Sequence, residues 1–200
     1  MSYDAIILDN DGVLTHLTGT DVVRAAEAQR AALQTGAKPL YDDVAYLFDL
    51  AGDEPTRPVD LDDDGSSRPV DFAGDGPARP IDLAVVSNNQ HATVEHILDV
   101  FGLDDLFSVA YGREPTIEGF RRRKPEPYYL ELAVSELGAE NALYVGDSNV
   151  DVLAADRAGV DVAFIRRPHR AEYELVAEPT YEIETLEELL PLVGCEPVPR

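Results

Sequence analysis

Residues 5–15 read AIILDNDGVLT, an apolar run that ends directly in two aspartates, Asp9 and Asp11. A short run of this kind is typical of a strand that is buried on both faces of a sheet. Two carboxylates placed so close together repel each other, so the end of this strand needs positive charge nearby. The stretch therefore predicts a buried strand that ends in a charged site.

The same pattern recurs along the chain, because short apolar segments alternate with amphipathic helical patterns. Residues 94–101, for example, carry apolar side chains at i, i+3, i+4 and i+7 and are followed by Gly102, as expected for a helix and its end. Strands that alternate with helices predict an α/β fold, here a three-layer, Rossmann-like parallel sheet with helices on both faces. The segments expected to be strands are 3–8, 83–86, 108–111, 143–145, 162–165 and 181–183, with further helices after Pro127 and over 150–158.

The connection between the first two strands is far longer than an ordinary crossover. We therefore expect residues 15–80 to be an inserted cap, and residues 1–14 and 81–200 to form the core. Helical patterns over 21–34 and 42–51 suggest a small helical hairpin. Residues 52–80 are rich in proline, glycine and acidic side chains, and such a segment is expected to be a loop without a core of its own.

The loop at 52–80 contains a repeat spaced by eleven residues, with RPVDL at 57–61, RPVDF at 68–72 and RPIDL at 79–83. Each copy is too short and too polar to stack as a solenoid. A local duplication of the entrance to the second strand is the simplest explanation, and we assign the repeat no function.

Residues 60–71 of the same loop fit the outline of a calcium-binding loop, because aspartates stand at several of the ligand positions. The flanks argue against calcium: no amphipathic helix precedes or follows, Pro69 lies inside the loop, and the last ligand would be aspartate instead of glutamate. An acidic loop adapted to salt is the better interpretation.

The chain is strongly acidic, since 39 acidic and 16 basic residues give its 200 residues a formal net charge of -23. Such a charge repels nucleic acid and anionic membrane surfaces, so neither is expected as a partner. The excess of aspartate and the presence of only two lysines, Lys38 and Lys124, suggest a protein adapted to concentrated salt. Our hypothesis is a halophilic cytoplasm.

The remaining composition points to the same kind of protein. The single cysteine, Cys195, cannot form an internal disulfide. No segment resembles a signal peptide or is long and apolar enough to cross a membrane. We therefore expect a soluble, cytoplasmic protein, and the sequence predicts no oligomeric state.

Polar residues follow the ends of the first four predicted strands. In an open parallel sheet, ligand groups gather at the carboxyl ends of the strands, so these side chains are expected to converge in one crevice. They are Asp9 and Asp11 after the first strand, Ser87 and Asn88 after the second, Lys124 after the third, and Asp147 and Asp151 after the fourth.

This set of side chains suits phosphoryl transfer. One carboxylate can attack phosphorus to give an aspartyl-phosphate, and a second can protonate the leaving oxygen and later activate water. Asp9 and Asp11 fit these two roles. Because nucleophile and phosphate are both anionic, a hard divalent cation such as Mg²⁺ is needed between them, with Asp147 as a further ligand. The hydroxyl of Ser87 and the ammonium of Lys124 would complete a cradle for the phosphoryl group.

Outside the inserted segment, the chain resembles the haloacid dehalogenase superfamily of phosphatases and related enzymes. The resemblance rests on four motifs in the expected order: DNDGVL at 9–14, VVSN at 85–88, KPEP at 124–127 and GDSNVD at 146–151. It implies that Asp9 is the nucleophile and that Asp11 is the general acid and base, with its main-chain carbonyl on Mg²⁺. The insertion stands where this family carries a cap that selects substrates.

The resemblance also implies a phosphate-binding set and a metal-binding set. Ser87, Asn88 and Lys124 would bind the phosphate. Asp9, Asp11 and Asp147 would bind the metal, and Asp151 would either bind it or orient the lysine.

Within the family, Asp11 favours phosphate esters, because the dehalogenases lack this second aspartate. The phosphatases of the phosphoglycolate type are the nearest match, so we expect a Mg²⁺-dependent phosphomonoester hydrolase that acts on a small phosphorylated metabolite. The alternatives are a sugar phosphomutase, which needs a fuller helical cap, and a non-catalytic module that binds phosphate or a partner. Two basic stretches, 121–123 and 166–170, either steer an anionic substrate or pair with surface acids, and both interpretations stay open.

Overall fold

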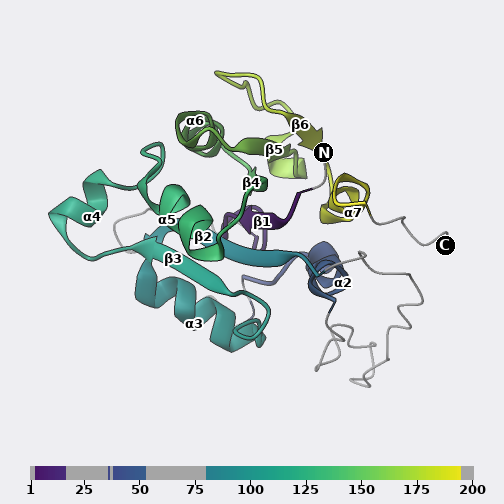
Figure 1. Cartoon of the computed structure of the whole chain (residues 1–200), viewed down its shortest axis with the longest axis horizontal. Helices are drawn as coiled ribbons and strands as arrows, with labels where there is room; N and C mark the ends of the chain where they lie inside the picture. The colour runs from purple at the N-terminus through teal and green to yellow at the C-terminus, as the bar shows by residue number, and fades with distance from the viewer. Residues whose placement is uncertain (1–2, 17–35, 37, 53–79, 195–200) are drawn as a thin grey trace.

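The computed structural model describes residues 3–16, 36, 38–52 and 80–194. In this part of the chain, six strands form one parallel sheet in the order β3-β2-β1-β4-β5-β6 (Figure 1). The predicted α/β fold with a parallel sheet is confirmed. The strands are β1 (Ala5–Leu8), β2 (Asp82–Gln90), β3 (Val109–Arg113), β4 (Ala142–Gly146), β5 (Asp161–Ile165) and β6 (Tyr181–Ile183).

Most of the helices lie in the connections between these strands, and the last two follow β6. The helices α3 (His91–Phe101), α5 (Tyr128–Leu137) and α6 (Asn149–Ala158) end at Gly102, Gly138 and Gly159, as the sequence patterns predict. The 3-10 helices are η2 (Asp42–Ala45), η3 (Pro168–Arg170) and η4 (Leu186–Glu188). The α-helices are α2 (Tyr46–Ala51), α3 (His91–Phe101), α4 (Ile117–Arg121), α5 (Tyr128–Leu137), α6 (Asn149–Ala158) and α7 (Leu189–Leu192).

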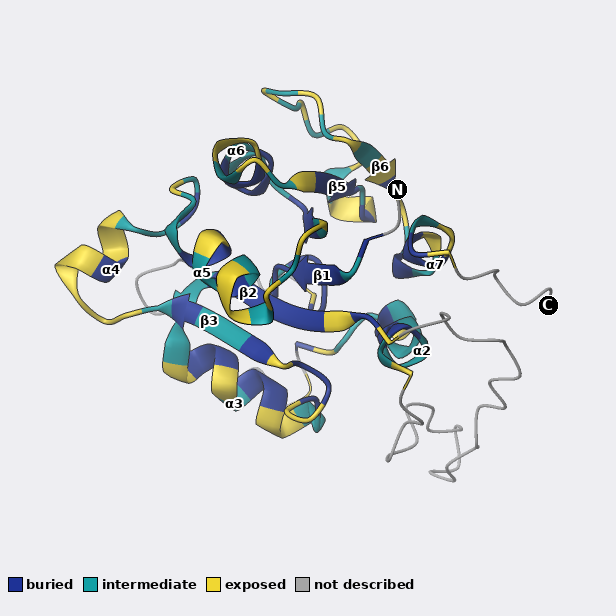
Figure 2. Ribbon diagram, viewed as in Figure 1, coloured by how far each residue is buried: buried dark blue, intermediate teal, exposed yellow. Residues whose placement is uncertain are grey.

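Helices cover both faces of the sheet, and successive residues of each strand alternate between two apolar cores. Leu8 and Val85 lie in the core beneath α2, α3 and α7, whereas Ile7 and Tyr144 lie in the core beneath α5 and α6. Buried residues line β1 and the inner side of α3, while the outer side of α3 is exposed (Figure 2). Burial of one such aliphatic side chain stabilises the fold by roughly 1.5–3 kcal/mol. The predicted three-layer arrangement is confirmed.

The second strand is longer than the sequence pattern indicates. β2 continues to Gln90, and its pairing with β3 is regular up to Ser87 and Gly112 before the register shifts. Gly112 of β3 lies against the start of α3, and a Cβ at this position would lie 2.6 Å from the main chain of His91. The irregular end of β2 therefore carries the polar residues that follow Val86.

The described part of the insertion packs into the core. The helical pattern predicted over 42–51 is present as η2 followed by α2, which ends at Gly52. Val44, Leu47 and Leu50 are fully buried in the same cluster as Leu8. The partner helix expected at 21–34, the first two copies of the repeat and the acidic segment 60–71 lie outside the described residues, so the cap boundaries at 15 and 80 stay predictions.

No helix in the described ranges is both long enough and apolar enough to cross a membrane.

Candidate active site

The loop after β1 begins the site. Asp9 continues the ladder, because its N–H donates to the carbonyl of Val145 over 2.9 Å. The N–H groups of Leu14 and Thr15 then donate to the carbonyl of Asn10, which folds the chain back on itself. Gly12 has a φ of +83°, and a Cβ there would overlap the carboxylate of Asp147. Glycine is therefore required where the first and fourth motifs meet.

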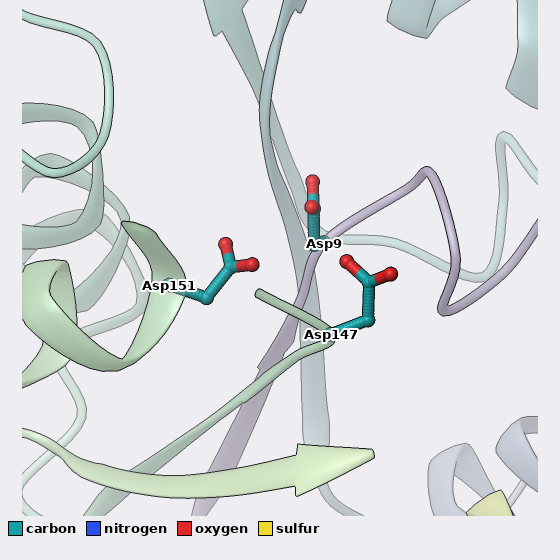
Figure 3. A group of neighbouring side chains, drawn as sticks. All are labelled: Asp9, Asp147 and Asp151. Atoms are coloured by element: carbon teal, nitrogen blue, oxygen red, sulfur yellow. The ribbon is translucent and has the colours of Figure 1, made fainter. Parts of the chain in front are cut away.

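Three carboxylates converge beside this loop. Asp9 follows β1, Asp147 follows β4, and Asp151 lies in the first turn of α6. One oxygen from each lies within 4.8 Å of the others, and all three residues are buried. Figure 3 shows the side chain of Asp151 directed from α6 toward the other two. The convergence expected at the carboxyl ends of the strands is present.

Lys124 neutralises part of this charge. Its Nζ lies 2.9 Å from Asp9 Oδ1 and 2.7 Å from Asp151 Oδ1, and only 3% of its side chain is exposed. Nζ also donates to the hydroxyl of Tyr144 over 2.6 Å and to the carbonyl of Val86 over 3.1 Å. Burial alone would lower the pKa of Lys124, but the carboxylates of Asp151 and Asp9 outweigh it and hold the pKa above its usual value.

Asn88 holds the main chain of Lys124. The N–H of Lys124 donates to Asn88 Oδ1 over 2.8 Å, and Asn88 Nδ2 donates back to the Lys124 carbonyl over 3.1 Å. These two hydrogen bonds use one of the two N–H donors of Asn88 Nδ2. A phosphate contact from Asn88 stays a prediction.

Asp151 accepts hydrogen bonds on both carboxylate oxygens. Oδ1 accepts from the Tyr144 hydroxyl over 3.0 Å and faces Lys124, and Oδ2 accepts from the N–H and the hydroxyl of Ser148. The contacts with Ser148 form a capping box at the start of α6. Of the two roles that the sequence left open for Asp151, these contacts favour orientation of the lysine.

Asp147 is paired with two basic side chains. His169 Nε2 lies 2.9 Å and Arg170 Nε lies 3.0 Å from its Oδ2. Both residues belong to the basic stretch 166–170, and the sequence analysis assigned His169 no role. The contacts occupy one oxygen of Asp147 and leave Oδ1 for a cation.

The environment of Asp9 favours its protonated form. Burial raises the pKa of Asp9 to about 7, Lys124 counteracts this, and the carboxylates of Asp151 and Asp147 add to the rise. Asp9 Oδ1 accepts hydrogen bonds from Lys124 Nζ and from the N–H of Asn10. A divalent cation bound beside Asp9 would favour its ionised form.

Asp11 points to the other side of the loop. Its Oδ1 is ion-paired with Lys38 Nζ, and its Oδ2 accepts from Asn89 Nδ2 over 2.7 Å. Lys38 was not predicted from the sequence. The rarity of lysine could have pointed to it, because both lysines of the chain lie in the site.

Ser87 lies at the predicted position near the end of β2. It is buried, and its hydroxyl accepts a hydrogen bond from the N–H of Asn89 over 3.2 Å. A role in binding phosphate stays a prediction for Ser87, as it does for Lys124.

The rest of the basic stretch 166–170 pairs with acids. Arg167 is buried and donates to both carboxylate oxygens of Asp43, over 2.6 and 2.9 Å, and to the carbonyl of Val13. Arg166 pairs with Glu182 over 2.7 Å. Pairing with surface acids, one of the two interpretations of this stretch, therefore holds for Arg166, whereas Arg167 forms a buried ion pair.

Comparison with known proteins agrees with the fold and with the resemblance found in the sequence. The model of haloacid dehalogenase-like hydrolases matches residues 78–165. A pyrophosphatase PpaX of Halalkalibacterium halodurans is 33% identical over 117 residues, which are 57% of this chain and 53% of the relative. A phosphoglycolate phosphatase of Cereibacter sphaeroides is 36% identical over 88 residues, which are 44% of this chain and 38% of the relative. The chain thus spans about half or less of the length of these curated relatives.

Solved structures share the fold over nearly the whole chain. A phosphatase from Thermococcus onnurineus superposes with a TM-score of 0.63 at 19% identity, covering 99% of this chain and 100% of that protein. Identity this low supports the arrangement of strands and helices alone.

Proposed function

We propose that this chain is a phosphatase of the haloacid dehalogenase-like hydrolases, whose model matches residues 78–165, and that it hydrolyses a small phosphorylated metabolite with the help of a divalent cation, Mg²⁺ by preference. The phosphatase names of its curated relatives support this class of activity. Those names also suggest the first substrates to test, phosphoglycolate and pyrophosphate. A sugar phosphomutase and a non-catalytic module have no specific support among the described residues.

The contact between Asp9 and Lys124 carries the proposal. A nucleophilic carboxylate must meet an anionic phosphoryl group, so it needs positive charge at the point of attack. The ammonium of Lys124 lies 2.9 Å from Asp9 Oδ1, and the contacts with Asn88, Tyr144 and Asp151 fix it there. A lysine that is buried and held from several sides is preorganised to face the transferred group.

The donor set of the site fits a hard divalent cation. It consists of carboxylate oxygens alone, buried and close together, which is the kind of ligand that Mg²⁺ prefers. We infer that Asp9 and Asp147 would hold the cation, while Asp151 holds Lys124. A bound cation would supply the charge that lets the carboxylate and the phosphate approach each other.

In the proposed mechanism each residue has its own role. Asp9 Oδ2 attacks phosphorus, which forms an aspartyl-phosphate and breaks the bond to the ester oxygen. Asp11 enters this step protonated and gives its proton to that oxygen as the alcohol leaves. A water molecule next attacks the phosphorus and passes a proton to Asp11, which releases phosphate and restores the carboxylate of Asp9. Lys124 stays beside the phosphoryl oxygens throughout and stabilises their charge.

Hydrolysis of p-nitrophenyl phosphate tests the proposal. We expect activity with Mg²⁺ in molar KCl, none with EDTA, and none in Asp9→Asn, whose far-UV circular dichroism should match that of the wild type. Turnover by Asp9→Asn would contradict the role of Asp9. A panel of small phosphate esters that includes phosphoglycolate, together with the anhydride pyrophosphate, would then define the substrate class.

The same preparation tests the hypothesis of a halophilic cytoplasm. With a formal net charge of -23, the folded chain repels itself, and salt screens this repulsion. We expect the melting temperature to rise from dilute buffer to molar KCl. Equal stability in both solutions would contradict the hypothesis.

A further inference from the structure

Lys38 is a buried cation that the four motifs do not include. It comes from the segment inserted after β1, and 0% of its side chain is exposed. An unpaired ammonium in such a place would be costly to bury, so its partner matters. That partner is Asp11, whose Oδ1 is ion-paired with Lys38 Nζ.

The main chain around Lys38 is held against the loop that carries Asp11. The N–H of His16 donates to the carbonyl of Pro39 over 3.1 Å, and the N–H of Tyr41 donates to the carbonyl of Leu14 over 3.0 Å. An antiparallel bridge also joins Thr15 and Leu40. Backbone pairing therefore sets the position of Lys38 relative to Asp11.

The carboxylate of Asp11 is held on both of its oxygens. Asn89 Nδ2 donates to Oδ2 over 2.7 Å from the end of β2, opposite the contact of Lys38 with Oδ1. Longer contacts to Oδ1 come from Asn10 Nδ2 at 3.4 Å and Thr15 Oγ1 at 3.5 Å. Asp11 nevertheless keeps 26% of its side chain exposed, so a substrate can reach it. Two strong donors from separate segments thus determine the plane of a carboxylate that stays accessible.

We propose that Lys38 is a positioning residue for Asp11, which it holds in the orientation needed to protonate the leaving oxygen. This role rests on the proposed phosphatase function. The insertion thereby contributes to catalysis through a main-chain pairing with the core, in addition to any selection of substrates.

The effect of removing Lys38 on the rate should depend on the leaving group of the ester. A nitrophenolate leaves as a stable anion and gains little from a proton donor, whereas an alkoxide leaves poorly without one. A misplaced Asp11 should therefore slow alkyl esters far more than nitrophenyl esters. A general loss of folding or of phosphate binding would slow both to the same extent.

The test compares p-nitrophenyl phosphate, phenyl phosphate and glycerol 3-phosphate in the wild type and in Lys38→Met. The measured quantity is kcat/KM, because it reports the steps up to departure of the alcohol and excludes later hydrolysis of the aspartyl-phosphate. We expect a loss of about 100-fold for glycerol 3-phosphate, a smaller loss for phenyl phosphate, and less than about 5-fold for p-nitrophenyl phosphate. Equal losses for all three esters would overturn the proposal.

Two further single variants and one double variant serve as controls for this result. Asn89→Ala, which removes the donor to the other oxygen, should show the same dependence on the ester even if Lys38→Met fails to fold. In Asp11→Asn, which should share this dependence, adding Lys38→Met should cause little further loss, because both changes act on one step. Additive losses would overturn the positioning role. Absence of turnover that depends on Asp9 in the wild type would remove the proposed function and this role together, whereas turnover with uniform losses would remove this role alone.

Discussion

The two lysines of the chain lie in different parts of one site and pair with different aspartates. Lys124 lies at the ends of the core strands, where it contacts Asp9, Asp151, Tyr144 and Val86. Lys38 comes from the insertion and is paired with Asp11, which is partly exposed. Both side chains are buried. Lys124 belongs to a hydrogen-bonded network inside the core, whereas Lys38 lies where the insertion meets the loop after β1. In the proposed mechanism, Lys124 serves the phosphoryl group and Lys38 serves the leaving group.

The substitution with the largest expected effect on stability and turnover is that of Lys124. Lys124→Met would leave Asp9 and Asp151 buried without a cation, and breaking a buried ion pair in this way costs about 3–5 kcal/mol. Turnover of every ester should fall by about 1000-fold or more, because the lysine faces the group that all esters share. Urea unfolding and kcat for the three esters measure the two effects. A loss confined to alkyl esters would erase the contrast with Lys38.

Asp9 should carry a stability cost in the metal-free protein. Its pKa in the folded state is about 7, above the ordinary 3.8, so the folded state binds the proton more tightly. The contribution of Asp9 to stability therefore falls as pH rises from about 4 to about 7, and the cost is complete above pH 7. We expect Asp9→Asn in EDTA to be about 2 kcal/mol more stable than the wild type at pH 8, with a smaller difference at pH 5. Urea unfolding at the two pH values checks this, and a larger difference at pH 5 would contradict it.

The pairing of Asp147 should weaken metal binding. Arg170 places a positive charge 3.0 Å from Asp147 Oδ2, close to where a divalent cation would lie. Arg170→Gln removes that charge and should tighten Mg²⁺ binding by about 3- to 10-fold, or about 1 kcal/mol. Calorimetric titration of the apo protein with MgCl₂ gives the dissociation constant. Weaker binding in the variant would show that Arg170 mainly orients the carboxylate.

The smallest expected effect is the change in the free energy of unfolding caused by Lys38→Met. The carboxylate of Asp11 is 26% exposed, so it can be hydrated after the lysine is lost, and methionine can fill the apolar space of the stem. We expect the free energy of unfolding to change by less than about 1 kcal/mol. A loss of stability as large as that caused by Lys124→Met would contradict the difference that the structure indicates between the two lysines.

The sequence was sufficient for much of the fold because its signals are local. The alternation of strands and helices, and glycines such as Gly102 and Gly159, depend on neighbouring residues alone. The helix over 42–51 was predicted from its own periodicity, but its burial in the core was not. Its apolar face alone does not indicate whether a cap or the sheet will cover it.

The site was predictable where its residues follow strand ends. Asp9, Asp147, Asp151 and Lys124 were expected together, because parallel strands bring their carboxyl ends to one edge, and they lie together. The contacts of Lys38, His169 and Arg170 with the carboxylates of the site were not expected. Lys38 lies in the insertion, and His169 and Arg170 lie in η3; no local pattern specifies where these segments pass relative to the strand ends.

By itself, the sequence determined the order of strands and helices, the chemical character of the strand ends and the kind of reaction that such groups can support. Only the tertiary structure decided which cation faces which carboxylate. It placed Lys124 between Asp9 and Asp151, Lys38 on Asp11, and His169 and Arg170 on Asp147. The physical reason is that strand and helix signals act between neighbours in the chain, whereas charge pairing acts through space between segments that only folding brings together.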